Sequence, residues 1–224
     1  MITNEQLNTL VKRARETTTK RNFTQSAELT LVLKDIDVKK GFSLNETVVL
    51  PNPTKTGASL CVLGSGDMGL RAKRAGVETV MEADSLGRLG SNKRDARKIV
   101  RQHDFFLADA SLMSSVGRSL GQFLGPKGKM PTPLPYGAPI ENIATRLRSS
   151  VRIRSKNQLN MSTKIGDETL TDDQLVENAN AVISAVEKKL PQGDKNLRNT
   201  IVKFTMGKPV KLNSINKQSK SESL

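Results

Sequence analysis

The sequence predicts a protein of mixed α/β and α+β class in which one domain is inserted into another. An amphipathic helix and two strands open the chain, strands and helices alternate through its middle, and the opening pattern returns near Val151. Repeated β-α units indicate a parallel sheet covered on both faces. We therefore expect a split α+β domain formed by both chain ends, residues 1–57 and 151–224, and an inserted α/β domain at residues 58–150.

The first section begins with a helical pattern. Apolar residues recur at the spacing of one helix face between Asn4 and Thr17, where we expect the helix to end. Apolar and polar residues then alternate over Ala27–Leu33, the pattern of a strand with one buried face. A second strand is predicted over Glu46–Leu50, and Pro51 ends it because proline cannot donate to a strand ladder.

Short apolar runs alternate with helical segments through the middle of the chain. They predict strands over residues 59–63, 77–81 and 104–108, and helices over residues 67–75, 92–102 and 111–123. The segment Gly125–Pro139 is rich in proline and glycine, which favour neither helix nor strand, so we expect a loop there. A further helix should begin at Pro139.

The last section starts with strand-like alternation at Val151–Arg154. Thr171–Gln174 forms a capping box, in which two side chains satisfy free backbone donors of a helix's first turn. Apolar residues then recur on one face as far as Pro191, which ends the helix. A last strand is predicted over Thr200–Met206, and a polar tail over Leu212–Leu224.

The chain is strongly basic, with 36 lysine and arginine residues against 22 aspartate and glutamate residues and a formal net charge of +14. A surplus of this size indicates a polyanionic partner, because binding to phosphates releases condensed counterions. Aromatic residues make up only 3% of the chain. This scarcity argues against a module that stacks single-stranded bases on aromatic rings.

The single cysteine, Cys61, and the single histidine, His103, limit the available chemistry. One cysteine cannot form an internal disulfide, which favours a reducing compartment, and two such residues are too few for a zinc cluster. No signal peptide or apolar run of about 18 residues is visible, so we expect no membrane association. No residue stands out as catalytic, and we expect neither a cofactor nor a metal.

One glycine motif leaves an enzymatic function open. Gly64–Gly69 fits the pattern G-x-G-x-x-G between a predicted strand and a predicted helix, and Glu82 and Asp84 follow the next strand. In dinucleotide-binding proteins such glycines admit a pyrophosphate to a helix N-terminus. Glycine is also common at ordinary β-α turns, so a nucleotide-dependent enzyme remains the alternative hypothesis. Gly121–Gly128 is not a phosphate loop, because Lys127 is followed by glycine rather than serine or threonine.

The predicted helix over residues 92–102 is basic. Lys93, Arg97 and Arg101 recur at every fourth position and share one helix face. Such a face can follow the phosphates of a nucleic acid or can simply be solvated, and the sequence leaves both interpretations open.

Several separated motifs resemble those of one known family. Leu124–Pro133 is similar to the glycine- and proline-rich motif of the large-ribosomal-subunit protein one family, the protein of the mobile stalk. Phe204–Gly207 contains a second motif of that family, Thr-Met-Gly. Phe23 with Glu28, and the segment Thr47–Pro51, fit in the same order, and the wording of the first motif resembles the archaeal branch.

The resemblance implies a Rossmann-like inserted domain without a cofactor and a protein that is not an enzyme. It implies a structural constituent of the large subunit of cytoplasmic ribosomes that binds stalk rRNA near the exit site of deacylated tRNA. It also implies help in releasing that tRNA and repression of translation through the protein's own mRNA. We expect a monomer within the ribosome.

The resemblance further implies which residues contact RNA. On the split domain they are Phe23, Thr24, Ser26, Glu28, Gly166, Thr205, Met206 and Gly207. The charge pattern adds as electrostatic neighbours Lys20, Arg21, Lys164 and Lys208. The family loop of the inserted domain comprises Gly125, Pro126, Lys127, Gly128, Lys129, Met130, Pro131 and Pro133. The alternative for Phe23 and Met206 is ordinary core packing, and for the loop it is a structural turn.

Overall fold

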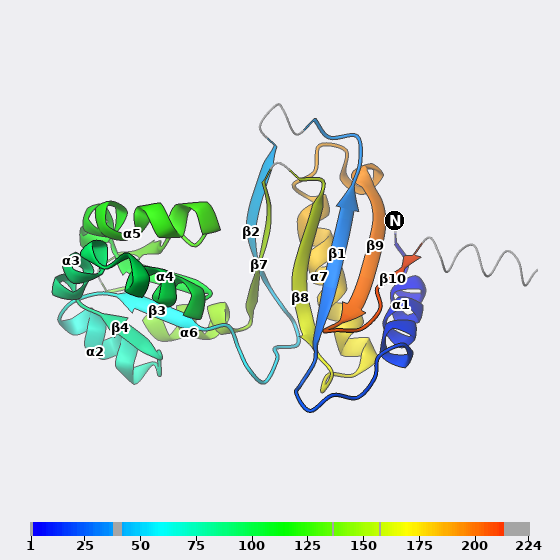
Figure 1. Cartoon of the computed structure of the whole chain (residues 1–224), viewed down its shortest axis with the longest axis horizontal. Helices are drawn as coiled ribbons and strands as arrows, with labels where there is room; N and C mark the ends of the chain where they lie inside the picture. Colours follow the sequence, from blue (N-terminus) through cyan, green and yellow to red (C-terminus); the bar gives the residue numbers. More distant parts are fainter. Residues whose placement is uncertain (1, 38–41, 136, 157, 213–224) are drawn as a thin grey trace, which may run out of the picture. The chain divides into compact units, whose positions relative to one another are not determined.

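A computed structural model describes residues 2–37, 42–135, 137–156 and 158–212. The chain divides into two compact units: Met1–Lys55 with Ser150–Leu224 form the first, and Thr56–Ser149 form the second (Figure 1). The first unit combines antiparallel strands with helices, and the second has a parallel sheet, so the predicted fold class is confirmed. From Asn213 onward the predicted polar tail lies outside the described residues.

The first unit contains a four-stranded antiparallel sheet in the order β10-β9-β1-β8. Its strands are β1 (Ser26–Leu33), β8 (Asn160–Asp167), β9 (Leu197–Phe204) and β10 (Val210–Lys211). A second, two-stranded antiparallel sheet pairs β2 (Ser43–Val49) with β7 (Ser150–Lys156). The unit's two α-helices are α1 (Asn4–Glu16) and α7 (Asp172–Glu187).

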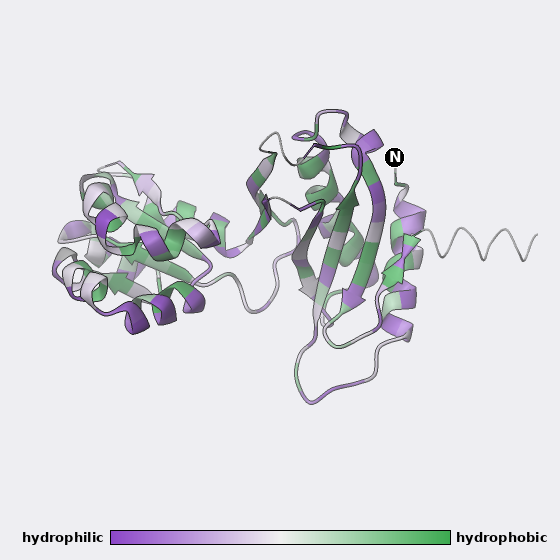
Figure 2. Cartoon of the chain, turned by 45° about the horizontal axis from the view of Figure 1, so that its top comes forward, coloured by the Kyte–Doolittle hydropathy of each residue, from purple (hydrophilic) through white to green (hydrophobic). Residues whose placement is uncertain are grey.

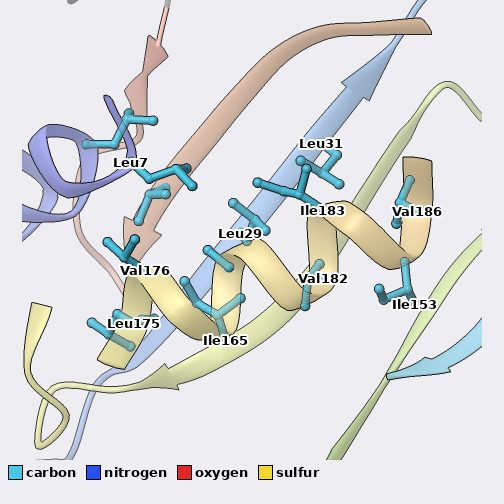
Figure 3. Close-up of a cluster of buried hydrophobic side chains, with 14 of the residues drawn as sticks. Leu7, Leu29, Leu31, Ile153, Ile165, Leu175, Val176, Val182, Ile183 and Val186 are labelled. Atoms are coloured by element: carbon cyan, nitrogen blue, oxygen red, sulfur yellow. The ribbon is translucent and has the colours of Figure 1, made fainter. Parts of the chain in front are cut away.

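Both helices begin at capping boxes, Thr3 with Gln6 for α1 and Thr171 with Gln174 for α7. Alternate residues of β1 are buried, and they share one core cluster with the apolar faces of α1 and α7. Figure 3 shows side chains of α7, such as Ile183, pointing toward Leu29 and Leu31 of β1. The two helices therefore cover one face of the sheet, and the opposite face is only partly buried (Figure 2).

Strand β8 follows no simple alternation, and the sequence pattern does not predict it. Its pairing with β1 shifts register between Ala27 and Glu28, a β-bulge, so that Ile165, Gly166 and Asp167 are buried in succession. A bulge adds an unpaired residue and breaks the period of two that marks a half-buried strand.

Four parallel strands form the sheet of the second unit, in the order β4-β3-β5-β6. They are β3 (Leu60–Leu63), β4 (Thr79–Met81), β5 (Phe105–Asp109) and β6 (Thr132–Leu134). The helices are α2 (Asp67–Arg74), α3 (Ala83–Ser91), α4 (Lys93–Gln102), α5 (Met113–Lys127) and α6 (Ile140–Arg148). Cys61 and Phe106 face a core shared with α3, α4 and α5, whereas Val62 and Leu107 face one shared with α2 and α6. Because both faces are covered, these strands are continuous apolar runs.

The expectation of a loop over Gly125–Pro139 is wrong at two places. Helix α5 continues through Pro126 to Lys127 and ends with Gly128 in the left-handed conformation, φ 67°. Lys129 N donates to Leu124 O at 3.0 Å, the bond of a Schellman motif, so the glycine serves as a helix stop. Residues 132–134 then form the edge strand β6, which tolerates Pro133 because an edge strand needs donors on one side only.

None of the described helices is both long enough and apolar enough to cross a membrane.

Cys61 lies fully buried in β3, and burial raises the pKa of its thiol to about 12. The thiolate is the reactive form, so the thiol of the folded chain should be inert to 5,5′-dithiobis(2-nitrobenzoic acid) near pH 8, about the ordinary thiol pKa. Absorbance at completion should show one reactive thiol per chain only after unfolding in denaturant. Reaction of the native chain at the rate of glutathione, used as a control, would contradict the burial of Cys61 in this sheet.

Candidate RNA-binding surface

Most of the split-domain residues predicted to contact RNA gather at one end and on the partly buried face of the β1 sheet. Phe23 and Thr24 precede β1, and Ser26 and Glu28 lie in its first half. The strand register places Lys164 of β8 directly beside Glu28. The segment Thr205–Lys208 directly follows β9, and its first residue bonds the backbone of Ser26.

The turn after β9 displays Met206. Gly207 N donates to Phe204 O at 2.8 Å and closes a four-residue β-turn. Met206 has φ 64°, at the position of such turns where glycine is favoured, and its side chain is 74% exposed. For a residue with a side chain this backbone conformation costs about 1–2 kcal/mol.

Thr205 fixes this turn to β1. Its backbone N–H donates to Ser26 O at 3.0 Å, and its Oγ1 accepts from Ser26 N at 3.1 Å and donates to the same carbonyl at 3.2 Å. The hydroxyl group expected to contact RNA is therefore already engaged within the fold.

Two glycines of the predicted site serve close packing inside the protein. A Cβ on Gly166 would lie 2.3 Å from Leu175 Cδ2, and this buried residue faces the core rather than the surface. A Cβ on Gly207 would lie 3.1 Å from Phe204 O and 2.8 Å from Thr18 Oγ1, so only glycine fits the turn without displacement. The structure thus joins Gly207 to the surface as a turn residue and separates Gly166 from it.

The exposed apolar side chains of the site are not core residues. Phe23 is 49% exposed, and like Met206 it is excluded from the core. The segment that carries Phe23 is anchored by Gln25, whose buried Nε2 donates to Thr19 O at 3.0 Å. The exposed cations Lys20 and Arg21 lie in the segment between these two anchor points.

The open sheet face is polar and carries charges in rows. Lys203 Nζ lies 3.1 Å from Glu28 Oε2, and Lys164 neighbours Glu28 on the opposite side in the strand register. An open depression in this face is lined by Ser26, Glu28, Ser162, Thr163 and Lys164. Two lysines around a single carboxylate leave the face with a positive surplus and with hydroxyl groups between the charges.

Arg15 supports this site, and the sequence gives no sign of it. Its Nε lies 2.8 Å from Asp172 Oδ1, and its other nitrogens donate to Glu168 O at 3.0 Å and Leu170 O at 2.8 Å. The guanidinium carbon lies 5.3 Å from the ring centroid of Phe204, directly before the exposed turn. In the sequence Arg15 is simply a cation in the last turn of an amphipathic helix, a position that suits the helix dipole alone.

The family loop of the second unit is partly structural. Lys129 Nζ donates to Val100 O at 3.2 Å and His103 O at 2.6 Å, which caps the C-terminus of α4. Pro131 is buried, whereas the remaining exposed members are Gly125, Pro126, Lys127, Met130 and Pro133. Lys129 and Pro131 therefore fit the alternative of a structural turn.

The glycine motif at Gly64–Gly69 does not form a phosphate site. Asp67 is the first residue of α2, where a pyrophosphate would bind, and its carboxylate pairs with Arg71 at 2.7 Å. Asp109 lines the same small depression and adds a second carboxylate. Like charges at this edge disfavour a phosphate group.

His103 offers no catalytic base in the same unit. It is buried at the end of α4, its ring lies edge-on to Phe106 at 6.0 Å, and burial lowers its pKa.

Comparison with known proteins identifies relatives over most of the chain. The sequence model described as "Ribosomal protein L1p/L10e family" matches residues 12–208. "Large ribosomal subunit protein uL1" of Cenarchaeum symbiosum (strain A) is 54% identical over 211 residues, 94% of this chain and 97% of the relative. The protein of the same name from Methanospirillum hungatei JF-1 is 41% identical over 203 residues, 90% of this chain and 94% of the relative. The one from Thermofilum pendens (strain DSM 2475 / Hrk 5) is 44% identical over 195 residues, 86% of each.

Arg15→Lys should lower the free energy of unfolding by about 2 kcal/mol, because lysine keeps the charge but loses the forked donors. Urea unfolding followed by far-ultraviolet circular dichroism measures this. Lys12→Gln changes an exposed cation of the same helix and serves as the control, with an expected change within about 0.5 kcal/mol. Equal effects of the two substitutions would show that Arg15 does not hold the β8–α7 connection.

Proposed function

Since the chain belongs to the ribosomal protein L1p/L10e family, we propose that the turn after β9 and the open face of the β1 sheet bind a folded segment of rRNA at the mobile stalk. The general function follows from the family: the chain is a structural protein of the large subunit of cytoplasmic ribosomes, it binds rRNA, and it is not an enzyme.

The observation that carries the proposal is the conformation of Met206. An apolar side chain that is 74% exposed on a strained backbone gains nothing within the isolated chain. Strain of this kind persists where the surrounding structure imposes it, and it concentrates at binding sites. The bonds between Thr205 and Ser26 impose it here, so the methionine is held ready for a partner.

The rest of the surface suits a folded RNA. The minor groove of an RNA helix is wide and shallow and displays 2′-hydroxyl groups, which a flat face with serine and threonine hydroxyls can approach. Lys164 and Lys203 on the sheet, with Lys20, Arg21 and Lys208 beside it, supply charges for phosphates. Phe23 and Met206 add apolar contact without the set of aromatic rings that base stacking would need.

Three finer functions extend this proposal. We place the rRNA contact near the exit site, where the protein binds deacylated tRNA and assists its release. A surface that recognises RNA shape also accepts an mRNA segment of similar fold, and through that segment the protein represses its own synthesis. The chain acts in each case as a monomer within or beside the ribosome.

Met206→Gly should separate binding from folding. Glycine adopts φ 64° without strain, so the free energy of unfolding should stay the same or rise by up to about 1 kcal/mol. The apolar contact disappears, so affinity for the stalk rRNA fragment should fall. Filter binding and thermal unfolding on the same preparation measure both effects.

Leu70→Gln is the matched control, because Leu70 is a 57% exposed apolar residue on α2 of the second unit. It should leave the affinity for the stalk fragment unchanged. A Met206→Gly chain that binds with wild-type affinity would remove the turn from the interface.

A further inference from the structure

Helix α4 of the second unit carries five cations in ten residues, Lys93, Arg94, Arg97, Lys98 and Arg101. At about 100° per residue they fall within an arc of about 140° of the helix surface. All five are exposed, and the helix turns the opposite side, with Ala96 and Val100, into the core. Asp95 lies outside the arc and bonds Asn92 at 2.6 Å as part of the N-cap.

The stability of the fold does not account for this basic face. Within the described part of the chain, no carboxylate lies at ion-pair distance from any of the five cations. Like charges four residues apart destabilise a helix, and Lys93 and Arg94 stand in the first turn, where the helix dipole disfavours cations. The last turn needs no further cation, since Lys129 already caps its carbonyl groups.

We propose that the basic face of α4 binds the phosphodiester backbone of a second RNA segment, separate from the one bound by the first unit. Lys93, Arg97 and Arg101 form a straight row about 12 Å long, suited to successive phosphates of one strand. Release of counterions from these phosphates supplies the binding energy, and the RNA relieves the repulsion within the helix.

The composition of α4 favours RNA over a lipid surface. A helix that binds membranes directs an apolar face toward the lipid, whereas the apolar face of α4 is already buried against α3, α5 and the sheet. The proposal rests on the rRNA-binding function of the first unit, which brings the chain to RNA. It adds a second contact whose chemistry is shared by rRNA outside the stalk and by tRNA.

The test compares two triple variants of the full chain with equal loss of charge. Lys93→Gln/Arg97→Gln/Arg101→Gln removes the row on α4, and Lys73→Gln/Arg74→Gln/Arg118→Gln removes three exposed cations of α2 and α5. Each chain is first bound to the stalk rRNA fragment. One arm then adds deacylated tRNA, and the other adds a large-subunit rRNA transcript that lacks the stalk. Affinity is measured by filter binding across a salt series.

In the arm that supplies the second segment, the α4 variant should lose about three units of the slope of log affinity against log salt, one per phosphate contact. The control should keep more of the wild-type slope, and both should bind the stalk fragment alone with similar affinity. The α4 variant should melt no lower than the wild type, since removing like charges relieves repulsion.

Equal slopes for the two variants in both arms would overturn the inference, because net charge alone would then explain binding. Failure of the first-unit proposal is distinguishable, since it appears as loss of preference for the stalk fragment in the wild-type chain.

Discussion

The hydrogen bonds between Thr205 and Ser26 fix the end of β9 against the start of β1, and the proposed rRNA surface depends on them. They hold the turn that puts Met206 into solvent with a strained backbone. Beneath the turn, Arg15 packs on Phe204 and bonds the connection between β8 and α7. The exposed side chain is thus supported by both the sheet and the helix layer.

The two units use charge in different ways. The open face of the β1 sheet mixes lysines with hydroxyl groups and one carboxylate, a pattern that can select a shape. The outer side of α4 carries cations without acids inside its arc, and such a row follows any phosphate backbone. A specific contact on one unit and a positioning contact on the other together account for the high net charge of +14.

The sequence was sufficient where local rules decide the structure. The capping box at Thr171 and the alternation in Ala27–Leu33 predicted α7 and β1 correctly. It was insufficient where distant residues decide: Arg15 finds Asp172 more than 150 positions away, and the bulge hides the alternation of β8. Glycine would be expected at the left-handed position of the turn after β9, so only the structure reveals the strain at Met206.

The central claim is that this chain recognises the fold of the stalk rRNA and not merely its charge. Filter binding of the purified chain to the stalk rRNA fragment and to an unrelated hairpin of equal length, across a salt series, tests it most directly. The account predicts a strong preference for the stalk fragment that persists as salt rises. Equal and steeply salt-dependent binding to both RNAs would contradict it.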